Sequence, residues 1–290
     1  MNVFFACGAP KSGTTWLQRL LDAHPAVSCS GEGHFIDRFS APMAEVVRQY
    51  NQHMAVVGER VYEGQPCYPP LDQETFDDLI RGFILGRLTS RALEPGVRWF
   101  GDKTPGNVLF LPQLDRLFPA ARFISIVRDP RDVIVSRLEH AVRAGLPRTD
   151  MDGQDEIIRR GAQEWVRSVN AFAEFAAAHA GRVHGLRFED LLTDPVGEAH
   201  RLFGFLGVST EPALMAEIAA ATSFEAQSGR PPGVEDASSF LRKGVAGDWR
   251  SRLDPPAVRR VEETCGDLLF DYGYGAGPPR TAQLIPLRRA

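Results

Sequence analysis

The stretch Gly8-Ala9-Pro10-Lys11-Ser12-Gly13-Thr14-Thr15 decides the fold of this chain. The apolar residues 3–7 before it predict a short buried strand, and the apolar spacing in residues 14–23 predicts a helix after it. Where a strand turns into a helix in this way, successive backbone N–H groups and the helix dipole bind an anionic phosphate. The stretch therefore predicts a phosphate-binding loop.

The position of the lysine separates this loop from that of nucleotide kinases and ATPases. Their pattern is G-x-x-x-x-G-K-[ST], in which the lysine reaches the β- and γ-phosphates and the hydroxyl contacts magnesium. Here Thr14 stands where that lysine belongs, and Lys11 lies inside the loop. A kinase or ATPase with a degenerate loop is the first alternative, but the loop of this chain lacks the residues that would place the triphosphate and magnesium of such an enzyme.

The order of strand, turn and helix recurs along the chain. After the apolar residues 122–127, for example, Asp129-Pro130 supplies a helix cap and a first-turn proline. Such alternation predicts an α/β fold with a central parallel sheet flanked by helices. No linker divides the chain, so we expect one domain over residues 1–275 and a tail over residues 276–290. The predicted strands are 3–7, 26–29, 97–100, 122–127 and 182–186, and the predicted helices are 14–23, 72–88, 130–138, 154–179 and 197–206.

The composition limits what the chain can bind. Of its 290 residues 43% are hydrophobic and 24% charged, and its formal net charge is −4. This balance excludes a disordered chain and disfavours a nucleic-acid binder, which needs a basic excess. The four cysteines form no C-x-x-C pair and have no histidine at metal spacing, so we expect no metal site. Isolated thiols, and the lack of an apolar segment long enough for a signal or a membrane span, predict a cytoplasmic location.

Lysine is rare in this chain and occurs at three notable positions. Lys11, Lys103 and Lys243 are the only lysines among 33 Lys and Arg residues, and each lies in a segment that contains glycine. A compact ammonium on a flexible stem serves where a planar guanidinium does not fit. The three lysines are therefore candidates for functional cations.

Five segments, in the same order over residues 1–270, resemble the sulfotransferases that use 3′-phosphoadenosine 5′-phosphosulfate (PAPS). Pro10-Lys11-Ser12-Gly13-Thr14-Thr15-Trp16 resembles their 5′-phosphosulfate loop, P-K-S/A-G-T-T-W. Residues 128–136 (RDPRDVIVS) resemble their 3′-phosphate segment, R-[ND]-P-x-D-x-x-x-S. The other three are 188–191 (FEDL, for Y-E-D-L), 222–224 (TSF) and 242–249 (RKGVAGDW, for R-K-G-x-x-G-D-W). Phe188 replaces the usual tyrosine, so ring stacking can persist but the phenolic hydrogen bond cannot.

The resemblance implies the P-loop-like sulfotransferase fold, with PAPS as the cofactor and adenosine 3′,5′-bisphosphate (PAP) as its product. PAPS carries anions at two ends, which calls for two separated cationic sites with aromatic rings between them. The residues that the resemblance implies for cofactor binding are Lys11, Ser12, Gly13, Thr14, Thr15, Trp16, Arg128, Ser136, Phe188, Thr222, Phe224, Arg242, Lys243 and Gly244.

Transfer of a sulfuryl group to a hydroxyl requires a general base. Cytosolic small-molecule sulfotransferases use the histidine of a Lys-Thr-His segment, but Pro105 occupies that place here. Tyrosylprotein-type members use a glutamate, and Ser30-Gly31-Glu32 resembles their C-G-E-E stretch. We therefore predict Glu32 as the base, ahead of His34 and His140. The predicted catalytic residues are Glu32, Lys11 and Lys103.

The acceptor is a small-molecule or peptide hydroxyl that the sequence does not identify. We expect residues 36–70 and 228–240 to line its pocket, and the aromatic side chains of Phe35, Phe39, Tyr62 and Tyr68 allow an apolar or aromatic acceptor without requiring one. The oligomeric state stays open, with a homodimer among the alternatives. A further alternative is a non-catalytic nucleotide-binding protein, which would bind the cofactor without transferring its group.

Overall fold

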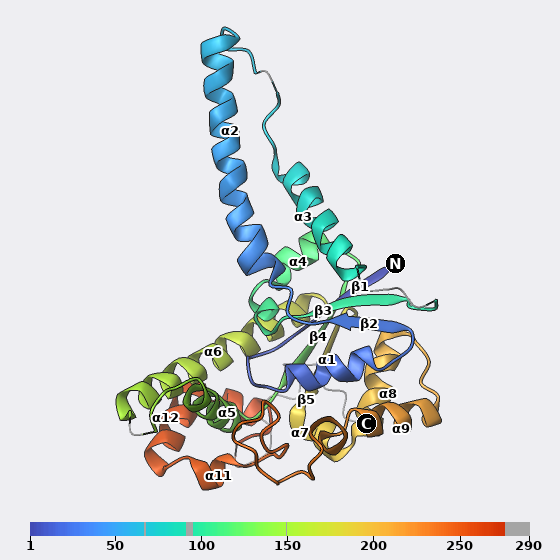
Figure 1. The fold of residues 1–290 in the computed structure, drawn as a ribbon, viewed down its shortest axis with the longest axis vertical. Helices are drawn as coiled ribbons and strands as arrows, with labels where there is room; N and C mark the ends of the chain where they lie inside the picture. Colours follow the sequence, from blue (N-terminus) through green and yellow to red (C-terminus); the bar gives the residue numbers. More distant parts are fainter. Residues whose placement is uncertain (67, 91–94, 149, 276–290) are drawn as a thin grey trace.

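The computed structural model describes residues 1–66, 68–90, 95–148 and 150–275. At its centre lies a sheet of five parallel strands in the order β2-β3-β1-β4-β5 (Figure 1). Its strands are β1 (Asn2–Cys7), β2 (Val27–Ser30), β3 (Trp99–Lys103), β4 (Arg122–Val127) and β5 (Val183–Arg187). Because β1 is the middle strand, the phosphate-binding loop leaves the sheet at the centre of its carboxyl edge.

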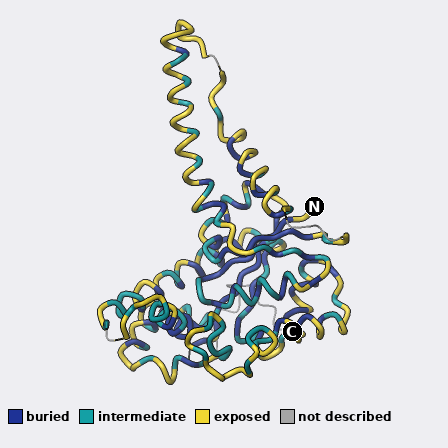
Figure 2. The backbone as a smooth tube through the Cα atoms, viewed as in Figure 1, coloured by how far each residue is buried: buried dark blue, intermediate teal, exposed yellow. Residues whose placement is uncertain are grey.

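Helices cover both faces of the sheet, as a parallel sheet requires. Along β1, Val3, Phe5 and Cys7 are buried in one apolar cluster, and Phe4 and Ala6 in another, because successive side chains of a strand point to opposite faces. The first cluster includes residues of α3 (Gln73–Leu88), α4 (Leu111–Leu117), α5 (Pro130–Arg143), α6 (Met151–Ala178) and α12 (Pro255–Cys265). The second includes residues of α1 (Thr14–Asp22), α7 (Phe188–Thr193), α8 (Pro195–Leu206) and α9 (Pro212–Ala221). Figure 2 shows the sheet as the buried centre of the molecule.

Helix α2 (Ala41–Val61) projects away from the sheet together with the chain that returns from it (Figures 1 and 2). Gly58 is the only buried residue of this helix, which the structure describes throughout. The Asn51 side chain bonds the backbone N–H and C=O of Leu71, each at 2.9 Å, and so ties the returning chain to the helix. Near the base of the projection, Phe39 stacks on Phe83 of α3 at 3.7 Å.

This projection bears on one prediction. None of the described residues between 36 and 70 lines the pocket of the candidate site, so that part of the expected acceptor lining stays a prediction. Helix α2 extends away from the carboxyl edge, while Phe35 and Ile36 are buried in the core. The other segment, 228–240, does reach the pocket, through Phe240.

The predicted fold class is confirmed, and so are two helix caps. Asp72 accepts a hydrogen bond from the Thr75 backbone at the start of α3, and Asp129 accepts one from the Arg131 backbone at the start of α5, both at 2.9 Å. Among the described residues, no helix has both the length and the hydrophobicity to cross a membrane. The predicted tail, residues 276–290, lies outside the described residues.

Candidate active site

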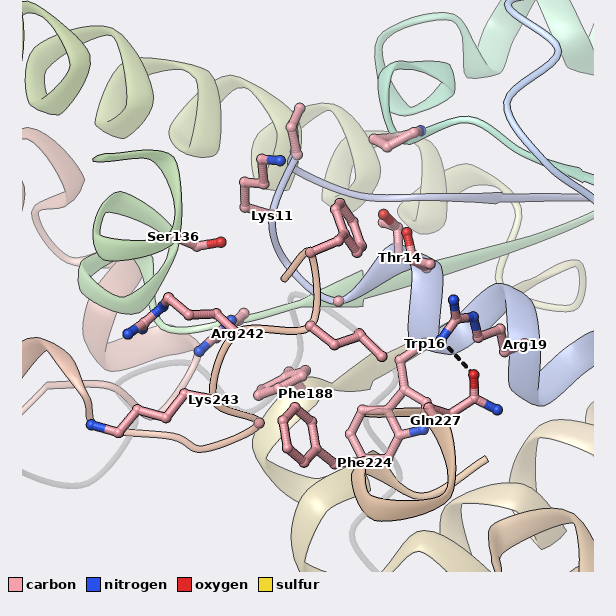
Figure 3. Close-up of a pocket in the computed structure, with 18 of the residues that line it drawn as sticks. Lys11, Thr14, Trp16, Arg19, Ser136, Phe188, Phe224, Gln227, Arg242 and Lys243 are labelled. Carbon is pink, nitrogen blue, oxygen red and sulfur yellow. Dashed lines mark hydrogen bonds between the residues drawn. The ribbon is translucent and has the colours of Figure 1, made fainter. Parts of the chain in front are cut away.

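A pocket of about 450 Å³ lies at the carboxyl edge of the sheet. Every strand contributes a residue that follows it and lines this pocket: Lys11 after β1, Glu32 after β2, Pro105 after β3, Arg128 after β4 and Phe188 after β5. The carboxyl edge of an open parallel sheet is where such folds bind ligands. Figure 3 shows its polar and aromatic side chains gathered from distant parts of the sequence.

The loop after β1 has a backbone that only a few residue types accept. Gly13 has a φ of 95° and precedes the first turn of α1, and Lys11 has a φ of 73° although it carries a side chain. A Cβ atom on Gly13 would lie 2.6 Å from Cδ2 of Phe188, so glycine is required for both backbone and space. The start of the helix and the loop N–H groups lie where the sequence predicts an anion site.

Lys11 lies in a strongly cationic neighbourhood. Burial, followed by the charges of Arg143 and Arg137, lowers the pKa of Lys11 below its usual value, and Glu32 only partly opposes this. The Lys11 ammonium lies 5.3 Å from the ring centre of Phe240. An anion bound here would relieve the repulsion among these cations.

Glu32 and Lys103 form an ion pair at the edge of the pocket. The Lys103 Nζ atom donates to Glu32 Oε1 at 2.7 Å, and His34 Nε2 lies 3.5 Å from Glu32 Oε2. Burial raises the pKa of Glu32, but the hydrogen bond and charge of Lys103, with a smaller contribution from His34, outweigh burial and hold it below its usual value. The carboxylate is therefore ionised at neutral pH. Its side chain is 44% exposed, whereas that of Lys103 is only 3% exposed, so an acceptor can reach the carboxylate.

Arg128 joins the end of β4 to the segment that closes the pocket. Its Nη2 atom donates to the Val245 carbonyl at 3.0 Å, and its guanidinium lies 4.3 Å from the ring centre of Phe188. Its Nε atom is buried and has no hydrogen-bond partner. Ser136, two turns into α5, also lines the pocket, on the left in Figure 3.

Three aromatic rings occupy the middle and the opposite side of the pocket (Figure 3). Trp16 meets the edge of Phe188 at 5.6 Å between ring centres. Phe224, at the start of α10 (Phe224–Ser228), lies so close to Gly244 that a Cβ atom there would be 2.3 Å from the ring. Thr222 also lines the pocket, but its hydroxyl donates to the Ile218 carbonyl within α9.

Residues 229–248, here called the strap, supply the second group of cations. Arg242 and Lys243 both pair with Asp248, and the Lys243 distance is 2.6 Å. The end of the strap is anchored by Asp132 of α5, which accepts hydrogen bonds from the backbone N–H groups of Gly247 at 2.6 Å and of Trp249, the residue directly after the strap, at 2.9 Å. Arg128 and Lys243 line one pocket, as the resemblance requires, although the Lys243 ammonium is engaged by a carboxylate.

Most predicted site residues meet in this pocket, and two do not line it. Ser12 is a fully buried residue of the loop whose hydroxyl has no hydrogen-bond partner among the described residues, and Lys103 contacts the lining through Glu32. The alternative base His34 lines the pocket, whereas His140 does not. The remaining predicted residues line the pocket: Lys11, Gly13, Thr14, Thr15, Trp16, Glu32, Arg128, Ser136, Phe188, Thr222, Phe224, Arg242, Lys243 and Gly244.

Sequence reasoning missed several charged residues that line the pocket. Arg19 lies three residues after Trp16 in α1, and Glu139 and Arg143 lie three and seven residues after Ser136 in α5. Residues at these spacings share a helix face, so helical spacing counted from each motif could have found them. Arg19 also bonds Gln227 of α10, which links the phosphate-loop helix to the helix that carries Phe224.

Comparison with curated proteins finds sulfotransferases. Protein-tyrosine sulfotransferase 2 of Gallus gallus is 26% identical over 211 residues, which cover 72% of this chain and 52% of that protein. The omega-hydroxy-beta-dihydromenaquinone-9 sulfotransferase of Mycobacterium bovis is 28% identical over 194 residues, which cover 63% of this chain and 43% of that protein. The chain thus spans about half the length of these two relatives.

Comparison with solved structures agrees on the fold. A mouse sulfotransferase complexed with PAP matches with a TM-score of 0.56 at 21% identity, over 93% of this chain and 84% of that one. A model of the sulfotransferase family matches residues 4–212, which include the phosphate-binding loop, Glu32, Lys103 and the segment after β4. This match extends over more than half of the chain, and we conclude that the chain belongs to the sulfotransferase family of enzymes.

Proposed function

We propose that this chain transfers a sulfuryl group from PAPS to the hydroxyl of an acceptor, with Glu32 as the general base. The observation that carries the proposal is the convergence of three kinds of group on one pocket. Lys11, Glu32, Arg128 and Ser136 line it together with the rings of Trp16, Phe188 and Phe224, and Lys103 pairs with Glu32. A doubly anionic adenine nucleotide needs these three kinds of group at once.

The residues present fit such a ligand. The buried Nε of Arg128 and Nε1 of Trp16 have no hydrogen-bond partner, which marks them as donors that a ligand can satisfy. The loop N–H groups and Lys11 would hold the 5′ end, and Arg128 and Ser136, together with the strap cations, would hold the 3′-phosphate. The rings of Trp16, Phe188 and Phe224 would hold the adenine. Bound PAPS would supply the activated sulfuryl group.

Glu32 would accept the proton of the acceptor hydroxyl. Its carboxylate is ionised at neutral pH, and within the described part of the chain Oε2 has one polar contact, to His34 at 3.5 Å, which leaves it open to an incoming hydroxyl. The ammonium of Lys103 fixes the other oxygen and adds positive charge close to the transfer site. In a loose in-line displacement, such positioning and charge stabilisation supply most of the rate enhancement.

Calorimetry distinguishes this proposal from a degenerate kinase or ATPase. We expect PAP to bind the wild-type protein without magnesium, and we expect ATP with magnesium to bind at least about tenfold more weakly, because the loop lacks the lysine that reaches the γ-phosphate. Preferential binding of ATP with magnesium would support the kinase alternative.

Single turnover of labelled PAPS tests the catalytic roles. We expect Lys11→Ala and Glu32→Gln each to lower transfer by about two orders of magnitude or more, with Glu32→Gln keeping its affinity for PAP. Full activity of Glu32→Gln would remove Glu32 from the mechanism. Binding of PAP without transfer to any acceptor would favour a non-catalytic nucleotide-binding protein.

The names of the relatives suggest the first acceptors to try. One relative is named for protein tyrosine and another for a hydroxylated menaquinone, so a phenolic and an aliphatic hydroxyl are both candidates. A tyrosine-containing peptide, the same peptide with phenylalanine, a small phenol and a long-chain primary alcohol form a matched panel. We propose the tyrosine hydroxyl as the first candidate, and transfer to the alcohol alone would overturn that choice.

A further inference from the structure

Asp102 is a fully buried carboxylate that bonds the loop carrying Glu32. It is the residue of β3 before the last, Lys103, and its Oδ1 atom accepts a hydrogen bond from the Gly33 backbone N–H at 2.8 Å. Its Oδ2 atom accepts from the Thr104 hydroxyl at 2.8 Å and from the Asn107 amide at 3.0 Å. Neither sequence motifs nor the lining of the pocket pointed to this residue.

The loop after Glu32 packs tightly against the Asp102 carboxylate. A Cβ atom on Gly33 would lie 2.8 Å from Asp102 Oδ1 and 2.4 Å from the ring of Phe35, so the backbone of the loop is pressed against the carboxylate. The same network makes a second hydrogen bond to the loop, since the His34 backbone N–H donates to the Thr104 hydroxyl at 3.4 Å. Residues 33 and 34, directly after Glu32, are thus fastened to the end of β3.

Burying a carboxylate costs free energy, and the cost is visible here. Burial raises the pKa of Asp102 to about 6, in spite of the three hydrogen bonds and the nearby Lys103 charge. An apolar residue at this position would avoid that cost. What the carboxylate provides is a short link between the strand that carries Lys103 and the loop that carries Glu32.

We propose that Asp102 is a positioning residue that holds Glu32 against Lys103 by clamping the backbone of residues 33 and 34. This inference rests on the proposed role of Glu32 as the base. A misplacement of a reacting group by about 1 Å can cost about a hundredfold in rate, so the clamp affects turnover although it touches no substrate.

Asp102→Ala tests the clamp in the full-length protein. Hydrogen exchange of the Gly33 amide should accelerate at least about tenfold, because its acceptor is gone. Turnover should fall about tenfold to a hundredfold, with the affinity for PAP unchanged within about twofold. Asp102→Asn should recover most of the turnover, since its side-chain oxygen can still accept from Gly33 while Asn107 turns its own amide. Should Asp102→Ala not fold, Thr104→Val tests the same network, with Thr104→Ser as the conservative variant.

Asp132→Ala is the matched comparison, because Asp132 is also buried and clamps a loop, the strap, through two backbone N–H groups. It should weaken PAP binding and leave the exchange of the Gly33 amide unchanged. Combining Asp102→Ala with Glu32→Gln separates the two proposals. If Asp102 acts through Glu32, the double variant is no slower than Glu32→Gln alone. Full additivity, or an unchanged Gly33 amide in Asp102→Ala, would overturn the positioning role, whereas an active Glu32→Gln would refute only the base assignment.

Discussion

Replacing Gly13 with alanine examines the packing on which the proposed nucleotide site depends. At a φ of 95°, an alanine costs about 1–2 kcal/mol more than glycine. Its Cβ atom would also lie 2.6 Å from Phe188, whose ring has the Arg128 guanidinium 4.3 Å from its centre and Trp16 at its edge. Displacing a ring held in this way costs about another 1–3 kcal/mol. The expected loss in the free energy of unfolding is therefore about 2–5 kcal/mol.

Gly145 offers the control for backbone strain alone. It has a φ of 107°, and a Cβ atom there would meet nothing within 4 Å. Gly145→Ala should therefore lose only about 1–2 kcal/mol and should bind PAP as the wild type does. For Gly13→Ala we expect PAP affinity to fall at least about tenfold, which is about 1.4 kcal/mol. Urea unfolding and calorimetry measure the two quantities, and equal losses in both variants would refute the steric argument.

Three further predictions concern other contacts. Lys103→Met removes the cation beside Glu32, so it should lower turnover by about two orders of magnitude and PAP affinity by less than about tenfold. Single turnover and calorimetry measure the two quantities, and equal losses of both would contradict this role of Lys103. Burial lowers the pKa of His184 to about 4, so the unfolded chain binds a proton that the native state does not, and stability falls as the pH decreases from about 6.5 towards 4. Between pH 7 and pH 5, urea unfolding should therefore show the wild type losing about 2 kcal/mol more free energy of unfolding than His184→Phe does. An equal loss in both proteins would show that His184 is not the group responsible. Arg19→Ala removes the bond to Gln227 and should weaken PAP binding about threefold to tenfold by calorimetry, whereas unchanged affinity would show that this link does not shape the pocket.

The parts of the site that are contiguous in sequence could be predicted well. The glycine-containing loop between β1 and α1, the cap at Asp129 and the five strands each have a local pattern, and the structure has all of them. Because parallel strands end at one edge, the same patterns also predicted that Glu32 and Lys11 share a crevice. Their presence in one pocket follows from topology alone.

Contacts across long sequence separations could not be predicted in the same way. The bond between Asp102 and Gly33 joins positions 69 residues apart, and no spacing rule connects them. The surroundings of the aromatic residues in 36–70 could not be predicted either, because an apolar side chain does not reveal which neighbour covers it. Tyr62 and Tyr68 are exposed, at 50% and 66%, and Phe39 packs on α3 instead of a ligand.

The pairing of Arg242 and Lys243 with Asp248 affects how an anion could bind to these two cations and leave them. Both cations already hold an internal carboxylate, and that contact keeps the pKa of Asp248 below its usual value despite burial. Under the proposed function, a phosphate that binds here would displace Asp248 instead of filling a vacant cationic site. When it leaves, Asp248 could pair again with both cations, while Glu235 stays available to Arg242 throughout.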